Sequence, residues 1–182
     1  MGNYKKNLKL LSENHVYSKE MEHDACGVGV IASTEGKKSR EIVEYGIQAL
    51  KAVWHRGAVD ADGKTGDGAG IHVEIPKDFF IEKIEVTGHD YDNSEICVGM
   101  IFLPRNDYSS QESCKTIVES ELTKNNFSIY GWRQVPVNPK ILGVKAFQTM
   151  PEIIQVLFKS NDPNLIDKNL ERKIYETRKI IE

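Results

Sequence analysis

Apolar residues recur at the spacing of an amphipathic helix in three segments of the chain. The first segment follows Ser39, whose side chain can cap a helix that has Glu41 in its first turn. Its apolar stripe advances by four, three and four residues and consists of Val43, Ile47, Leu50 and Trp54. The second predicted helix covers residues 107–124, with Cys114, Ile117, Val118 and Leu122 facing inward. The third lies in the final segment, where the spacing of four and seven links Leu170, Ile174 and Ile181.

Five other segments have the apolar or alternating pattern that is typical of strands. The first, residues 26–33, is a run of small and β-branched residues in which two glycines indicate close backbone approach. Residues 71–75 alternate between apolar and polar positions and stop at Pro76. The remaining three predicted strands are residues 96–103, 127–135 and 152–158. Strands framed by helices in this way predict an α+β protein with layered helices.

Composition narrows the class of protein. The 182 residues include 24 Lys and Arg against 27 Asp and Glu, giving a formal net charge of −3. This balance offers no long-range attraction to nucleic acid or anionic lipid, and no apolar run is long enough to cross a bilayer. We therefore expect no nucleic-acid partner and no membrane span. Three cysteines at long spacing, with no secretory signal, favour a cytoplasmic location.

A loop rich in Gly and Asp occupies residues 55–70, and it fails three common motifs. Its Gly57 and Gly63 are one residue too far apart for a phosphate loop. A calcium loop beginning at Asp60 would lack the required Gly and Glu at its sixth and twelfth positions. A dinucleotide-binding glycine pattern at Gly27 and Gly29 also fails, because Ala32 occupies its third glycine position. The five histidines have no tight ligand spacing, so we expect no metal site.

Cys26 has a setting that favours chemistry. A free cysteine is most often an inert apolar residue, which is how we interpret Cys97 and Cys114. Cys26, however, follows a polar segment, and the small residues beside it leave room for a substrate. Cleavage between Ala25 and Cys26 would place the thiol beside a free α-amine with a pKa near about 7.7 to 8.0. That amine could serve as the general base for attack by an N-terminal nucleophile.

Two long motifs are specific enough to indicate a family. They are HDACGVG over residues 23–29 and WHRGAVDADGKTGDGAGI over residues 54–71. Both resemble the processing site and the following loop of the glutamate synthase family, whose members contain a class II glutamine amidotransferase. The resemblance continues through Gly131-Trp132-Arg133 and residues 171–175, and so it covers nearly the whole chain.

The resemblance implies a four-layer αββα N-terminal-nucleophile hydrolase fold that is incomplete in this chain. Residues 1–25 would be a propeptide-like extension, and residues 26–182 the N-terminal portion of the amidotransferase domain. Cys26 would attack the side-chain amide of glutamine and release ammonia for transfer to 2-oxoglutarate. Arg56 would bind the substrate through its fork of donors. The surrounding loop would be shaped by Gly27, His55, Gly57 and Asp67, whereas Trp54 and Trp132 are expected to be packing residues.

Cofactors and partners also follow from the resemblance. FMN and an iron–sulfur cluster are implied for the full-length enzyme, with no cofactor in this segment. Besides glutamine, the implied partner is the remaining synthase region of the same polypeptide, and the family pattern allows a small electron-donating subunit.

The sequence lacks some of the residues that the family uses to stabilise the reaction intermediate and to bind glutamine. No Asn is followed by Gly, so the expected oxyanion-hole pair has no match, and neither have the residues that grip the α-groups of glutamine. The last predicted helix reaches Glu182 without a Gly or Asn stop signal. We therefore expect an N-terminal piece of a longer enzyme that is inactive alone. The alternatives are another N-terminal-nucleophile amidohydrolase and a non-catalytic fragment or interaction module of that fold.

Overall fold

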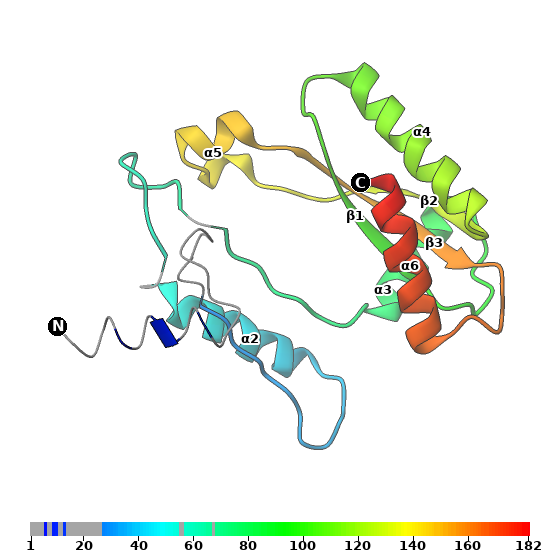
Figure 1. Cartoon of the computed structure of the whole chain (residues 1–182), viewed down its shortest axis with the longest axis horizontal. Coiled ribbons are helices and arrows are strands. Elements are labelled where there is room, and N and C mark those ends of the chain that lie inside the picture. The colour runs from blue at the N-terminus through cyan, green and yellow to red at the C-terminus, as the bar shows by residue number, and fades with distance from the viewer. Residues whose placement is uncertain (1–5, 7–8, 11–12, 14–26, 55–56, 67) are drawn as a thin grey trace. The chain divides into compact units, whose positions relative to one another are not determined.

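The computed structural model describes residues 6, 9–10, 13, 27–54, 57–66 and 68–182 (Figure 1). The chain divides into two compact units. The first unit comprises residues 1–58 and 67–71, and the second comprises residues 59–66 and 72–182.

A three-stranded antiparallel sheet forms the centre of the second unit, with strand order β1-β3-β2. Its strands are β1 (Cys97–Leu103), β2 (Phe127–Gln134) and β3 (Glu152–Ser160), which confirms three of the predicted strands. The central strand is β3, whose residues 154–158 are all buried, as expected for a strand paired on both edges. The chain thus has mixed α/β content built on one small sheet.

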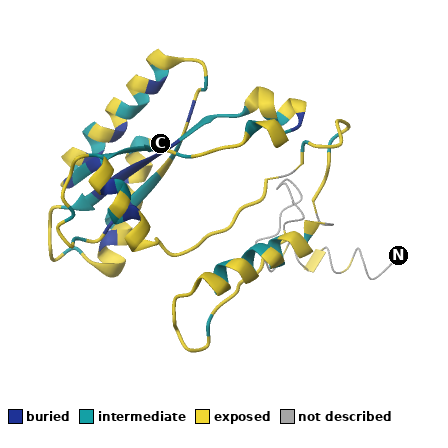
Figure 2. Cartoon of the chain, turned by 180° about the vertical axis from the view of Figure 1, so that it is seen from behind, coloured by how far each residue is buried: buried dark blue, intermediate teal, exposed yellow. Residues whose placement is uncertain are grey.

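Two helices cover one face of this sheet, and both were predicted from the sequence. They are α4 (Tyr108–Lys124) and α6 (Asp167–Ile181). Their buried residues join alternate strand residues in one apolar core, which consists of Cys97, Val118, Leu122, Phe127, Val156, Phe158 and Leu170. Figure 2 shows this burial concentrated in the sheet and on the inward sides of the helices. The prediction for Ile117 was wrong, because that side chain is exposed on α4.

A third helix, α3 (Lys77–Val86), packs on the opposite face of the sheet. Its Phe80 and Ile84 are buried with Tyr130 of β2 and Leu157 of β3. The same face carries Met100 and Phe102 of the edge strand β1, whose side chains are 50% and 64% exposed. The apolar pattern did not predict α3, η2 (Pro139–Ile141) or α5 (Val144–Thr149).

The first unit contains α2 (Arg40–Ala52), the helix predicted after Ser39. The Ser39 hydroxyl accepts a hydrogen bond from the backbone N–H of Ile42 at 3.4 Å, as an N-cap does. None of the helix residues is buried, so its apolar stripe is only half-buried. Trp54 follows the helix and is 77% exposed, so the expectation that it packs in a core was wrong.

Two predicted strands are absent from the described residues. Residues 27–33 and 71–75 have no regular secondary structure, and both segments are largely exposed; Cys26 itself lies outside the described part of the chain. Val28 illustrates the difference, with 88% of its surface exposed. A strand exists only where a neighbouring strand accepts and donates its backbone hydrogen bonds, and these segments pair with no described strand.

Within the ranges that the structure describes, no helix combines the length and the apolar character needed to pass through a bilayer.

Candidate functional site

Most of the predicted site residues fall outside the described part of the chain. These are Ala25, Cys26, His55, Arg56 and Asp67. The two that are described, Gly27 and Gly57, are both exposed and lie outside helices and strands. The backbone N–H of Gly57 donates to the carbonyl oxygen of Trp54 at 3.0 Å.

Between the predicted site residues, the chain forms a small hairpin at Val59–Gly66. Val59 and Gly66 form an isolated antiparallel bridge, and the Asp60 N–H donates to the Thr65 carbonyl oxygen at 2.7 Å. Gly63 turns the chain with a φ of 67°, a left-handed conformation that glycine adopts without steric cost. We call residues 59–66 the site hairpin, because in sequence it separates Arg56 from Asp67.

The Asp62 carboxylate organises the turn of the site hairpin. It accepts hydrogen bonds from the backbone N–H groups of Lys64 and Thr65, at 2.9 and 2.7 Å, and from the Thr65 hydroxyl at 2.6 Å. These donors, with the Thr65 hydroxyl contributing most, hold the pKa of Asp62 well below its usual range. Asp62 is therefore an ionised structural acceptor and not a proton donor.

The site hairpin contacts the start of α5 very closely. A Cβ added to the buried Gly143 would lie 2.5 Å from the Thr65 backbone nitrogen, and nearer still to the Thr65 hydroxyl and the Asp62 carboxylate. The Lys145 ammonium also forms an ion pair with Asp60, with Nζ and Oδ2 2.6 Å apart. Only a glycine at position 143 permits this approach.

The sequence pattern indicates the turn of the site hairpin but not its contact with α5. Asp62-Gly63 is a turn dipeptide, and an Asp three residues before a Thr is typical of a side-chain-capped turn. Gly143 and Lys145 carry no local signal, because their importance arises from a contact with residues about 80 positions earlier in the chain.

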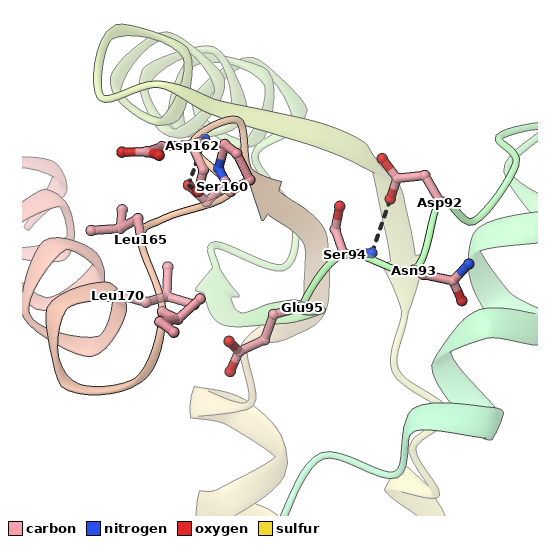
Figure 3. Close-up of a pocket in the computed structure, with 10 residues that line it drawn as sticks. Asp92, Asn93, Ser94, Glu95, Ser160, Asp162, Leu165 and Leu170 are labelled. Carbon is pink, nitrogen blue, oxygen red and sulfur yellow. Dashed lines mark hydrogen bonds between the residues drawn. The ribbon is translucent and has the colours of Figure 1, made fainter.

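A separate pocket of about 320 Å³ lies beside the loop that precedes β1 (Figure 3). Its lining includes three acids, Asp92, Glu95 and Asp162. The Asp92 carboxylate forms an ion pair with Lys159 and accepts a hydrogen bond from the Tyr130 hydroxyl at 2.8 Å.

The pKa of Asp92 lies well below its usual range, first because Lys159 donates to it and then because Ser94 does. Burial, followed by the effect of Asp92, raises the pKa of Tyr130 above its ordinary value. Asp92 therefore serves to bind the loop to the sheet. No group of three or more His, Cys, Asp or Glu residues suited to a metal ion occurs among the described residues.

The two described cysteines differ from the nucleophile proposed for the N-terminal segment. Cys97 is buried in the core, and burial raises the pKa of its thiol to about 12. Such a thiol carries almost no thiolate at neutral pH and is inert. Trp132 packs against the same core, so Cys97 and Trp132 are packing residues as the sequence predicted. Cys114 is half-buried on α4.

Comparison with known proteins defines the class. The family model for class II glutamine amidotransferases matches residues 26–182. The chain therefore belongs to the class II glutamine amidotransferases. Its relatives include the large chain of the NADPH-dependent glutamate synthase of Azospirillum brasilense, which is 50% identical over 182 residues. That alignment covers 100% of this chain and 12% of the relative.

Plant and algal relatives show the same relation. Ferredoxin-dependent glutamate synthase 2 of Arabidopsis thaliana is 40% identical over 88% of this chain and 10% of its own length. The ferredoxin-dependent glutamate synthase of Pyropia yezoensis is 38% identical over 96% of this chain and 11% of its own length. The chain thus spans about a tenth of the length of these relatives.

Proposed function

We propose that this chain is the N-terminal part of the glutaminase domain of a glutamate synthase, with Cys26 as its nucleophile. The observation that carries the proposal is the family match, which begins at Cys26 and continues to residue 182. It supports a division into a propeptide of residues 1–25 and an amidotransferase portion of residues 26–182. Removal of the propeptide would give Cys26 a free α-amine.

The first half of the reaction forms a thioester. The α-amine of Cys26 accepts the thiol proton, and the sulfur attacks the side-chain amide carbon of glutamine. The tetrahedral intermediate collapses with cleavage of the C–N bond, and the protonated amine returns its proton to the leaving ammonia. Arg56 binds the glutamine through its guanidinium donors, and His55, Gly57, Asp67 and Gly27 shape the loop around it.

The second half hydrolyses the thioester. The same amine accepts a proton from water as the water oxygen attacks the acyl carbon. The C–S bond then breaks to release glutamate, and the protonated amine returns its proton to the departing sulfur. The ammonia from the first half then passes to the remaining region of a longer polypeptide, where 2-oxoglutarate receives it.

Flavin and iron–sulfur chemistry belongs to that remaining region in the proposal. When bound there, FMN and the cluster supply the electrons for reduction. The three cysteines of this segment are widely spaced in sequence, and among the described residues no group of His, Cys, Asp or Glu is suited to a metal ion, so we propose that the cluster binds outside this segment. These relatives are named for NADPH or for ferredoxin, and we propose that an electron-donating partner of this kind serves the whole cytoplasmic enzyme.

The proposal also includes residues outside this chain. No Asn of the sequence is followed by Gly, and we propose that the oxyanion donors lie elsewhere in a longer polypeptide. Loss of a single oxyanion donor typically lowers the rate by about 10²–10³. We therefore propose that the 182-residue chain alone has little glutaminase activity.

The exposed face of the sheet supports our proposal that the complete domain has a four-layer αββα fold. One face of the sheet is covered by α4 and α6, which would form an outer helix layer. On the other face, α3 covers only part, and Met100 and Phe102 stay exposed. A second sheet packed there would bury them and complete the layers.

Substitution of the nucleophile in the full-length enzyme tests the proposal. We expect Cys26→Ala to lower glutamine hydrolysis by at least about 10⁴-fold, as loss of a nucleophile does. Cys114→Ala is the matched control, and we expect it to leave hydrolysis unchanged. Glutamine hydrolysis that survives Cys26→Ala would refute the assignment.

A further inference from the structure

We propose that the outer edge of β1 binds a fourth strand, contributed by the segment that follows α6 in a longer polypeptide. The occupant is an extended, uncharged segment that runs antiparallel to β1. The inference rests on the part of the proposed function that makes this chain a piece of a longer enzyme, and it does not depend on the nucleophile.

The order of elements in the sheet is that of two interleaved strand-helix-strand units, of which one is complete. Strands β1 and β2 are both antiparallel to β3, so they run parallel to each other, with α4 between them in sequence and β3 between them in the sheet. The elements β3 and α6 begin a second unit of the same kind. A strand after α6 would complete it.

The handedness of such units places the missing strand beside β1. Crossovers between parallel strands of one sheet are nearly always right-handed. Helices α4 and α6 contribute to the same apolar core on one face of the sheet, whereas β1 and β3 run in opposite directions. The two crossovers therefore move in opposite directions across the sheet, the first from β1 to β2 and the second from β3 past β1.

The course of α6 fits this path, because the helix runs back along the sheet from the end of β3 (Figure 1). Near its start, Leu170 lies in the same apolar core as Cys97, the first residue of β1. Near its end, Ile181 packs against that core, as does Ile101 of β1. A chain that continues from α6 is thus close to the level at which an antiparallel neighbour of β1 would begin.

The backbone of β1 presents hydrogen-bonding groups along this edge. The Val135 N–H donates to the Ile153 carbonyl oxygen at 3.1 Å, so Ile153 directs its backbone groups toward β2. Backbone groups alternate in direction along a strand, so those of Ile154 point toward its partner Ile101 in β1. The residues of β1 whose backbone groups point outward are then Val98, Met100 and Phe102. No hydrogen bond from another described residue reaches these outward groups.

The two edges of the sheet differ in how they are protected. On β2, the register shifts between Ile129 and Gly131, and the Tyr130 carbonyl oxygen already accepts from the Thr87 hydroxyl at 2.8 Å. Bulges and covering loops keep edge strands from pairing, as do charged side chains. Strand β1 has an unbroken register with β3 and no charged residue. We therefore assign the fourth strand to β1 and not to β2.

The side chains of β1 define the chemistry of the occupant. Met100 and Phe102 are 50% and 64% exposed. Apolar or aromatic cross-strand neighbours would cover them, whereas a charged neighbour would lose water without gaining an ion pair. The chain covers 12% of the Azospirillum brasilense relative, so a polypeptide of that length has ample sequence to supply such a strand.

Amide hydrogen exchange resolved to single residues tests the pairing, in the 182-residue chain and in the full-length enzyme. In the 182-residue chain, we expect the outward amides of β1 to exchange about 100-fold faster than those of Gly99 and Ile101, which pair with β3. In the full-length enzyme, we expect both groups to exchange at similar, slow rates. The control is the other edge, where the amides of Trp132 and Gln134 should exchange alike in the two proteins.

A photo-crosslinking side chain identifies the occupant. We would replace Phe102 by p-benzoylphenylalanine in the full-length enzyme and sequence the crosslinked peptides by mass spectrometry, with isotopically light and heavy subunits mixed. We expect a crosslink within one polypeptide to the segment directly after α6. The same replacement of Gln134, at the opposite edge, is the matched control and should not capture that segment.

Three results would overturn the inference. The first is a fast and slow alternation along β1 that persists in the full-length enzyme. The second is an equal gain of protection at both edges of the sheet, which would indicate general covering. The third is a crosslink from position 102 to a second subunit or to residues 27–33. Glutamine hydrolysis that does not depend on Cys26 would instead refute the proposed nucleophile and leave the fourth strand unaffected.

Discussion

The two units of the chain differ in burial and in predicted function. The second unit holds the apolar cores, whereas the first contains the segment of the predicted nucleophile. In the second unit, the sheet and the helices α3, α4 and α6 bury two apolar cores. In the first unit, α2 has no buried residue, and residues 27–33 next to Cys26 are mostly exposed. The family motifs are densest in the first unit and in the hairpin. We therefore expect apolar residues that look alike in sequence to contribute very differently to stability in the two units.

A matched pair of valines tests that difference with the largest expected effect on stability. Val156 is 2% exposed in the central strand, whereas Val28 is 88% exposed. We expect Val156→Ala to lower the free energy of unfolding by about 2 kcal/mol, because it removes buried methyl groups, and Val28→Ala to lower it by less than about 0.5 kcal/mol. Denaturant unfolding followed by circular dichroism measures both. Equal losses would contradict the division.

Removal of a helix N-cap in each unit is expected to have a smaller effect on stability. Asp107 caps α4 by accepting from the Ser110 N–H at 3.0 Å, and Ser39 caps α2. We expect Asp107→Ala to lower the free energy of unfolding of the sheet unit by about 1 kcal/mol. Ser39→Ala should leave that transition unchanged and speed amide exchange only in α2, as hydrogen exchange with mass spectrometry would show. A shift of the sheet transition by Ser39→Ala would indicate that the units unfold together.

The smallest expected effect concerns acid and the loop held by Asp92. The folded pKa of Asp92 lies below the ordinary 3.8, so its stabilising contribution is fully present above pH 3.8 and is lost as the pH falls through the folded value. Because its side chain is partly exposed, that contribution should stay below about 1 kcal/mol. Asp92→Asn should lower the unfolding midpoint at pH 7 and approach the wild type in stronger acid. A difference that grows on acidification would contradict this sign.

The sheet unit was largely predictable because its elements have strong local patterns. The spacing of Val118 and Leu122 predicted α4, and the apolar runs predicted all three strands. Helix α3 was missed although Phe80 and Ile84 stand four residues apart, and α5 has only six residues. The failures at residues 27–33 and 71–75 have another cause. A β-branched run shows that a segment can enter a sheet, but pairing requires a neighbour that the pattern does not identify.

The residues of the predicted site and of the site hairpin also differ in how far the sequence indicates them. Cys26, Arg56 and Asp67 come from motif resemblance, and they remain predictions because they lie outside the described residues. Asp62 and Thr65 have a recognisable turn pattern. Gly143 acquires its importance only through a contact with a distant segment, which no local pattern can reveal.

The mass and first residue of the mature full-length polypeptide would show whether Cys26 acts as an N-terminal nucleophile. Purification of the active enzyme, followed by intact mass spectrometry and terminal sequencing, would identify its N-terminus. We predict the loss of residues 1–25 and a mature chain that begins at Cys26 with a free α-amine. An active enzyme that retains Met1 or Gly2 at its terminus would contradict it, because Cys26 would then have no α-amine to act as its base.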